Sequence, residues 1–162
     1  MSRKRWFLPE TPDVLGMLRR QMTVTIDGAD VFARWAGGDA AAAQAVRDAE
    51  DQGDVAKRDL LSALREAFVT PIEPEDLFAL SRGIDRILNY VTALVEESEA
   101  MASPPDEGIA TMAGLRRHGG AAQRRGPHGA DHRRELYRRS SRIGEAVVDV
   151  AERIVYAVVK QS

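Results

Sequence analysis

Apolar residues recur at three- and four-residue steps along most of the chain, which is the spacing of helices that bury one face. The first such segment runs from about Pro12 to Trp35, and Gly37-Gly38-Asp39 follows it as a stop and a new N-cap. A second runs from Ala40 to about Val69, where Thr70-Pro71 ends it. These two predicted helices carry the stripes Val14, Leu15, Leu18, Met22, Ile26, Ala29 and Phe32–Ala33, and Val46, Ala49, Gly53, Ala56, Leu60, Leu64 and Phe68.

Two more long helices are predicted in the rest of the chain. Pro74-Glu75-Asp76 is typical of the first turn of a helix that reaches Met101, and the last helix runs from about Asp131 to Lys160. Their apolar stripes are Leu77, Leu80, Ile84, Ile87–Leu88, Val91 and Leu94–Val95, and Ile143, Val147, Val150, Ile154 and Val158. A short fourth helix is predicted between them, around Ile109, Met112 and Leu115.

The pattern predicts an all-α fold. The one β-branched patch, Thr23-Val24-Thr25-Ile26, is too short and isolated to found a sheet. Predicted helices of roughly 24–30 residues would each extend about 36–45 Å at ~1.5 Å per residue. Long helices joined by short turns favour an antiparallel bundle.

One segment interrupts the helical pattern. Residues 119–134 hold four glycines, one proline, four arginines and two histidines, and no large apolar side chain. We interpret residues 114–134 as a flexible basic loop because this composition neither buries apolar area nor favours a helix. The chain is therefore expected to form one domain with three parts: residues 1–113, the basic segment 114–134, and a final helix in 135–162.

Composition excludes several classes of protein. With 162 residues, 44% hydrophobic and 30% charged, the chain fits a single globular core. It has no cysteine, which excludes disulfides, thiolate metal sites and cysteine nucleophiles. No apolar run has the length of a membrane-spanning helix or follows the basic N-terminus as a secretory signal would. A cytoplasmic location is expected, with possible attachment to the inner face of the membrane.

Charge divides the chain unevenly. Residues 1–113 carry 12 Lys/Arg against 20 Asp/Glu, whereas residues 114–162 carry 11 against 5. Paired arginines at 116–117, 124–125, 133–134 and 138–139 are suited to phosphate groups of lipid or nucleic acid. Nucleic-acid binding is the less favoured interpretation, because Tyr137 is the only aromatic residue among them.

Acidic and amide side chains occur in pairs four residues apart on three predicted helices. Side chains at this spacing project from one side of a helix, so each pair offers oxygen ligands to one cation. The alternative is that these pairs are solvated surface charge, which is common at this charge content. The candidate ligands are Glu50 and Asp54, Asp85 and Asn89, Glu145 and Asp149, and Glu152 one turn further on.

Other candidate chemistry is weaker. His128 and His132 have a metal-ligand spacing, but Pro127 and Gly129 argue against the helix that this spacing needs. The sequence contains no Gly-x-Ser-x-Gly, no phosphate-binding glycine-rich loop and no His-Glu-x-x-His. No glutamate precedes a histidine by three residues, which disfavours a di-metal carboxylate oxidoreductase. The motifs give no indication of an enzyme.

The order of several motifs resembles a known family. Trp6-Phe7-Leu8-Pro9 is followed by Glu50-x-x-Gly53-Asp54, by the stretch FVTPIEPEDL at residues 68–77, and by Gly83-Ile84-Asp85. Together they resemble the DUF47 family of PhoU-like proteins, phosphate transport regulators also described as Pit accessory proteins. The resemblance covers about residues 4–113 and 135–161, and FVTPIEPEDL is its most specific part.

The resemblance implies an antiparallel PhoU-like bundle of long helices with metal-binding Glu-x-x-x-Asp motifs. By position, Glu50 and Asp54 match one motif and Asp85 the next, where Asn89 replaces a frequent acid. Glu145, Asp149 and Glu152 match the last motif less closely. The implied function is a non-enzymatic regulator of inorganic phosphate transport, with a Pit-type transporter as partner. The ions expected from oxygen ligands are Mg, Mn, Fe or Ca. The main alternative is a structural or protein-interaction bundle without metal.

The chain departs from the family where a further long helix should precede the last one. Residues 119–134 stand in its place, as a natural loop, a deletion or a shifted reading frame. A bundle that lacks one helix leaves part of the apolar face of its last helix uncovered. We therefore expect the chain to form a homo-oligomer or to be only marginally stable.

Overall fold

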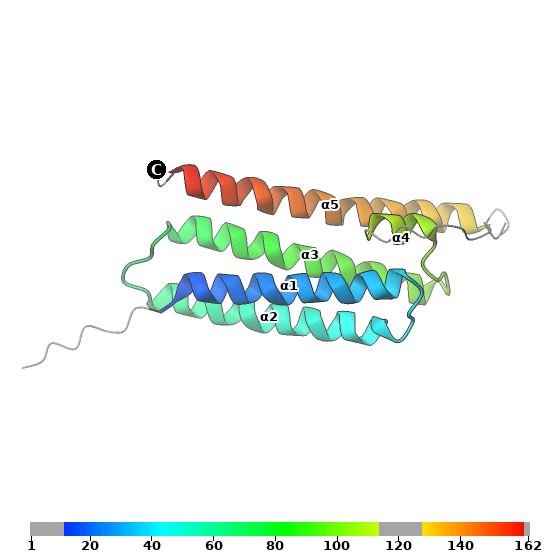
Figure 1. Cartoon of the computed structure of the whole chain (residues 1–162), viewed down its shortest axis with the longest axis horizontal. Coiled ribbons are helices and arrows are strands. Elements are labelled where there is room, and N and C mark those ends of the chain that lie inside the picture. Colours follow the sequence, from blue (N-terminus) through cyan, green and yellow to red (C-terminus); the bar gives the residue numbers. More distant parts are fainter. Residues whose placement is uncertain (1–11, 114–127, 161–162) are drawn as a thin grey trace, which may run out of the picture.

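The fold is all-α, as the apolar pattern predicts. A computed structural model describes residues 12–113 and 128–160. Helices α1 and α2 form a hairpin, α3 returns beside both, and α5 runs antiparallel to α3 on its outer side (Figure 1). The helices are α1 (Val14–Ala36), α2 (Ala42–Glu66), α3 (Pro74–Ala100), the short α4 (Glu107–Met112) and α5 (His128–Lys160).

Local sequence signals set most helix ends. Asp13 caps α1, because its Oδ1 accepts a hydrogen bond from the backbone N–H of Gly16 at 2.9 Å. Pro74 opens α3 at a position where its missing N–H costs nothing. Asp106 caps α4 by accepting from the N–H groups of Gly108 and Ile109. All five helices lie within a few residues of their predicted positions.

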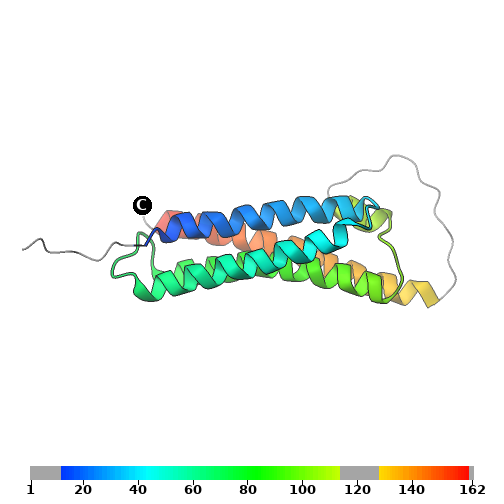
Figure 2. The same ribbon diagram turned by 90° about the horizontal axis from the view of Figure 1, so that it is seen from below.

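Helix α3 is the centre of the bundle. It contacts α1, α2 and α5, whereas no contact joins α5 to α1 or α2 at the backbone level among the described residues. Figure 2 shows the same arrangement from below, with α1 and α2 side by side. The close approach of α1 to α2 and α3 depends on Gly28. A Cβ at this position would lie 2.5 Å from Leu88 Cδ2 of α3 and 3.0 Å from Ala49 Cβ of α2.

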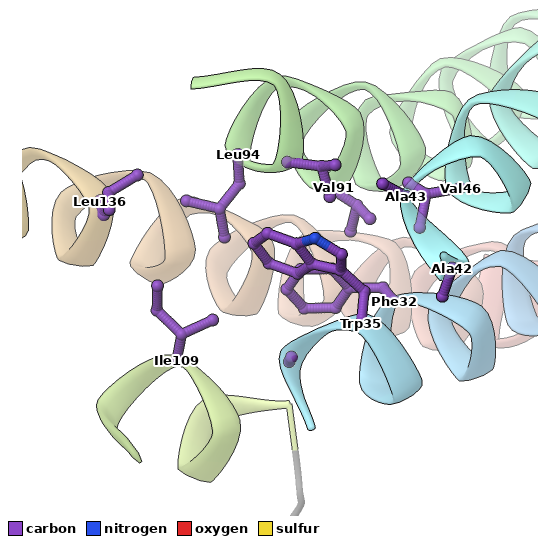
Figure 3. Packing of buried hydrophobic residues seen from close by; sticks show 11 residues of the cluster. Phe32, Trp35, Ala42, Ala43, Val46, Val91, Leu94, Ile109 and Leu136 are labelled. Carbon is purple, nitrogen blue, oxygen red and sulfur yellow. The ribbon is translucent and has the colours of Figure 1, made fainter. Parts of the chain in front are cut away.

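The largest core cluster lies where α1 turns into α2. Phe32 and Trp35 stack with ring centroids 5.6 Å apart and pack against residues of α2, α3, α4 and α5 (Figure 3). Ile109 of α4 and Leu136 of α5 are both fully buried in this cluster. The short helix α4 therefore covers the first part of α5. Two smaller clusters, around Leu77 and around Ile84, continue the core toward the other end.

The predicted stripes of α2 and α3 are largely confirmed, but that of α1 is partly wrong. Ile26 is 55% exposed, and its neighbours Gln21 and Thr25 are buried instead. The buried face of α1 is thus rotated relative to the predicted stripe, and Gln21 on this face is hydrogen-bonded to Ser81 of α3. Phe68, predicted as the last residue of the α2 stripe, is 97% exposed because α2 ends at Glu66.

The predicted basic loop is wrong in its last part. Helix α5 begins at His128, so residues 128–134 are helical, whereas residues 114–127 lie outside the described part of the chain. The objection that Pro127 and Gly129 exclude a helix at His128 and His132 is therefore wrong. Pro127 directly precedes the helix, where proline is tolerated, and one glycine is a modest cost in a helix of 33 residues. The motif Trp6-Phe7-Leu8-Pro9 also lies outside the described residues.

The expected uncovered apolar face is present on α5. Val147 and Ile154, predicted to be buried, are 48% and 42% exposed. The buried side of α5 is formed instead by Leu136, Ser140, Ala146, Val150 and Ala157. Among the described residues, only α3 and α4 come close to the backbone of α5, while side chains of α1 share two core clusters with it, so the remaining side of α5 has no helical neighbour. Within residues 12–113 and 128–160, no helix has both the length and the apolar character needed to cross a bilayer.

Candidate functional site

The first predicted ligand pair lies at the contact between α2 and α3. Glu50 and Asp54 are both half-buried, on either side of the turn that holds the buried Gly53. A Cβ at Gly53 would lie 2.8 Å from Leu88 Cδ1, so this glycine allows α3 to approach α2 closely. The close approach brings the second pair, Asp85 and Asn89, near the first.

A lysine that the sequence pattern does not single out joins these two helices. Lys57 Nζ donates to Asp85 Oδ2 at 2.6 Å and lies 3.8 Å from Asp54 Oδ1. Asn89 Nδ2 donates to the same Asp85 Oδ2 at 3.0 Å. Asn89 therefore acts as a donor to Asp85 here. One oxygen of Asp85 is already satisfied by two donors.

Negative charge gathers around Glu50. Burial raises the pKa of its carboxyl, and so do the neighbouring carboxylates of Asp54, Asp51, Asp85 and Glu96, in that order. These neighbours come from both α2 and α3. The surface between the two helices is thus a concentration of carboxylates with one ammonium group at its edge. Such a surface attracts cations.

The three candidate ligands of α5 lie elsewhere. Asp149 accepts from Arg86 of α3 at 2.7 Å and from Arg153 of its own helix at 3.2 Å. Glu145 and Glu152 are exposed. Because α5 packs on α3 and not on α2, the seven predicted residues form two separate sets. The structure brings together Glu50, Asp54, Asp85 and Asn89, and does not bring Glu145, Asp149 and Glu152 to them.

The part of the chain that the structure describes contains no preformed metal-binding site. No three His, Cys, Asp or Glu residues there converge closely enough to hold an ion. The side chains of His128 and His132 lie outside those that the structure describes. A metal site on α2 and α3 would therefore need the side chains of Glu50 and Asp54 to move toward Asp85.

Sequence reasoning missed a buried polar pair between α1 and α3, and a set of ion pairs made by Lys160 at the end of α5. Ser81 Oγ donates to Gln21 Oε1 at 2.8 Å, and Gln21 Nε2 donates to the Ser81 carbonyl oxygen at 3.0 Å, with both side chains fully buried. Lys160 donates to Glu73 and, at 3.2 Å, to Asp76, and these hydrogen bonds raise its pKa above the usual range. No sequence signal used above pointed to either, because Gln21 lies outside the predicted stripe of its helix.

Sequence reasoning also missed a groove between α1 and α5. It has a volume of about 350 Å³ and is lined by Phe32 of α1 and by Ser140, Ser141, Ile143, Gly144 and Val147 of α5. Its walls are mainly apolar, with small residues on the α5 side. The described residues that line it include no titratable side chain, so the groove suits an apolar side chain better than a reacting substrate.

Comparisons with protein-family models, with curated proteins and with solved structures give no match for this chain. The resemblance to PhoU-like proteins therefore rests on the motifs quoted above.

Proposed function

We propose that this chain is a non-enzymatic accessory protein of inorganic phosphate transport. It binds a metal ion through the carboxylates of α2 and α3 and acts on a low-affinity, Pit-type transporter from the cytoplasmic side. The resemblance of residues 4–113 and 135–161 to the DUF47 family supplies the transport process. The observation that carries the metal part is the meeting of Asp54 and Asp85 around Lys57 at the contact of α2 and α3, where burial first and then the neighbouring carboxylates raise the pKa of Glu50.

The physical argument for a metal ion is relief of repulsion. Glu50 and Asp54 lie near Asp85 at the contact of α2 and α3, and within the described part of the chain Lys57 is the one cation within hydrogen-bond distance of Asp85. A cation with oxygen ligands would offset the rest, and Mg, Mn, Fe or Ca are the ions suited to such ligands. A bound ion would also present positive charge to phosphate or to an acidic loop of the transporter.

Elemental analysis of the purified chain tests the metal part. We expect near-stoichiometric metal after incubation with Mg²⁺, Mn²⁺ or Fe²⁺, and its loss in the double variant Glu50→Ala/Asp54→Ala. The matched control is Asp27→Ala/Asp30→Ala, which removes two exposed carboxylates of α1 and should keep the metal. Protein that is folded and metal-free under all three conditions would refute the metal site.

Phosphate uptake tests the transport part. Deletion of the gene should change the uptake of labelled phosphate by cells that rely on a Pit-type transporter, and the native chain should restore it. Glu50→Ala/Asp54→Ala should fail to restore uptake if the metal is needed. Unchanged uptake after deletion would contradict the transport role whether or not metal binds.

A second candidate is an interaction bundle that binds no metal, and Lys57 favours it. The Lys57 ammonium occupies Asp85 Oδ2, the oxygen that would otherwise face the carboxylates of α2. In this alternative the acidic pairs are partly neutralised surface charge, and partner binding alone carries the function. Metal-free protein that still changes phosphate uptake would identify it.

A further inference from the structure

The turn between α2 and α3 exposes two large apolar side chains. Phe68 is 97% exposed, more than any other large apolar residue that the structure describes, and its neighbour Val69 is 66% exposed. The turn itself is anchored, because Ala67 and Ile72 on either side pack against the core. Thr70 Oγ1 also donates to the carbonyl oxygen of Ile72 at 2.6 Å. Two adjacent apolar side chains held outward on an anchored turn form a candidate docking surface.

The chain begins beside this turn. Val14, the first residue of α1, belongs to the same core cluster as the residues that anchor the turn. Figure 2 shows the start of α1 and the turn between α2 and α3 at one end of the bundle. Residues 1–11, which we define as the N-terminal segment, precede the described part of the chain and contain Trp6-Phe7-Leu8. These three residues lie six to eight positions before Val14. A chain of that length spans at most about 20–29 Å, so they are tethered within reach of Phe68.

The charge of the N-terminal segment is opposite to that of this end of the bundle. The segment carries Arg3, Lys4 and Arg5 directly before its apolar residues, and one acid, Glu10. A second copy would bring one acidic end against another, and an anionic lipid surface would repel these carboxylates. The N-terminal segment therefore fits this surface better than either. Between residues 65 and 75, the exposed charged residues are Arg65, Glu66, Glu73 and Glu75.

We propose that the N-terminal segment of this same chain docks on the turn between α2 and α3, with Trp6-Phe7-Leu8 against Phe68 and Val69. Arg3, Lys4 and Arg5 then lie beside the carboxylates that flank the turn. Burial of aromatic side chains from both partners favours the contact. The short tether raises the local concentration of the segment, so that a contact too weak between separate molecules is populated within one chain. The proposal is independent of metal binding and of phosphate transport.

The fluorescence of Trp6 tests the contact. The chain has two tryptophans, Trp6 and the buried Trp35, so a Trp6→Phe version of each protein isolates the emission of Trp6 by difference. In the native chain we expect this emission at short wavelength and little quenching by acrylamide. Phe68→Ser/Val69→Ser should shift it to longer wavelength and increase quenching several-fold. A Trp6 that is as accessible in the native chain as in this variant overturns the proposal.

A matched control separates the turn from exposed apolar surface in general. Ile26→Ser/Val55→Ser removes side chains of α1 and α2 that are 55% and 43% exposed, away from the turn, and should leave the emission of Trp6 unchanged. Circular dichroism shows whether both double variants keep their helix content. If the control exposes Trp6 as much as Phe68→Ser/Val69→Ser does, the assigned surface is wrong.

A charge exchange within one chain tests the orientation. Arg3→Glu/Lys4→Glu/Arg5→Glu should expose Trp6, and so should Glu66→Arg/Glu75→Arg, because each set places like charges together. The two sets combined restore opposite charges and should protect Trp6 again. Glu73 is left unchanged because it already binds Lys160. A combined variant with Trp6 as exposed as in either set alone refutes the arrangement.

Dilution and lipid identify any other occupant of the turn. Because the proposed contact lies within one chain, the emission of Trp6 should be the same at every protein concentration and without lipid. Emission that shifts on dilution would assign the turn to a second copy. Protection of Trp6 only after addition of phosphatidylcholine/phosphatidylglycerol vesicles would assign it to a lipid surface. Either result overturns the proposal.

Discussion

The ammonium group of Lys57 lies 2.6 Å from Asp85 Oδ2 and ties α2 to α3 at the point where the predicted metal ligands meet. Both side chains are largely buried, at 26% and 13% exposure. The ion pair therefore stabilises the same contact that a metal ion would occupy. A substitution that removes this ion pair therefore tests whether the surface has a structural role or a metal-binding one.

Replacement of Lys57 by Met should lower the free energy of unfolding by about 1–3 kcal/mol, because Asp85 loses its charged partner while it stays mostly buried. If the surface binds metal, Mn²⁺ should restore much of this loss and bind the variant more tightly than the native chain. Urea denaturation with and without Mn²⁺ measures both effects. Arg65→Met, at an exposed residue of α2, is the control and should change little.

Glu50→Gln should stabilise the chain at pH 7. The pKa of Glu50 is raised in the folded state above its ordinary value of about 4.5, so the folded chain holds the proton more tightly than the unfolded chain. Stability contributed by this group therefore falls as the pH rises from below 4.5 through the folded pKa. The gain in Glu50→Gln should be under ~1 kcal/mol, because solvent screens this surface. It should vanish near pH 4 and shrink in high salt, and urea denaturation at both pH values measures it.

Ser81→Ala should cost about 1–3 kcal/mol, because the buried Oε1 of Gln21 loses its donor. The double variant Gln21→Met/Ser81→Ala should recover part of the loss, since Met fills a similar volume without an unsatisfied oxygen. Chemical denaturation of the two single variants and the double variant gives the coupling energy. Additive losses would show that the two side chains do not depend on each other.

Two glycine substitutions should have opposite effects. Gly28→Ala places a methyl group 2.5 Å from Leu88 Cδ2 and should destabilise the bundle by about 1–3 kcal/mol. Gly144→Ala meets no atom within 4 Å and should stabilise the folded chain by about 1 kcal/mol through helix propensity. Thermal unfolding of both variants measures the contrast. A stabilising Gly28→Ala would mean that α1 and α3 are less closely packed than described.

Sequence periodicity determined the helices and their order. The proline and glycine signals located the ends of α1, α2 and α3 because they act within one or two turns. The α3 stripe from Leu77 to Val95 was predictable because this central helix has neighbours on several sides. At α5 the pattern was misleading, since apolar residues lie on two faces of the helix and only one of these faces is covered by other described residues.

Tertiary structure alone decided which residues meet. Spacing placed Glu50 with Asp54 and Asp85 with Asn89. The contact of α2 with α3 brought these two pairs together around Lys57. The packing of α5 on α3 placed Asp149 within hydrogen-bond distance of Arg86. The burial of Gln21 likewise depended on Ser81, sixty residues away in the chain. The physical reason is range: a helical period is set by bonds between residues four apart, whereas the partner of a side chain depends on which helices pack together.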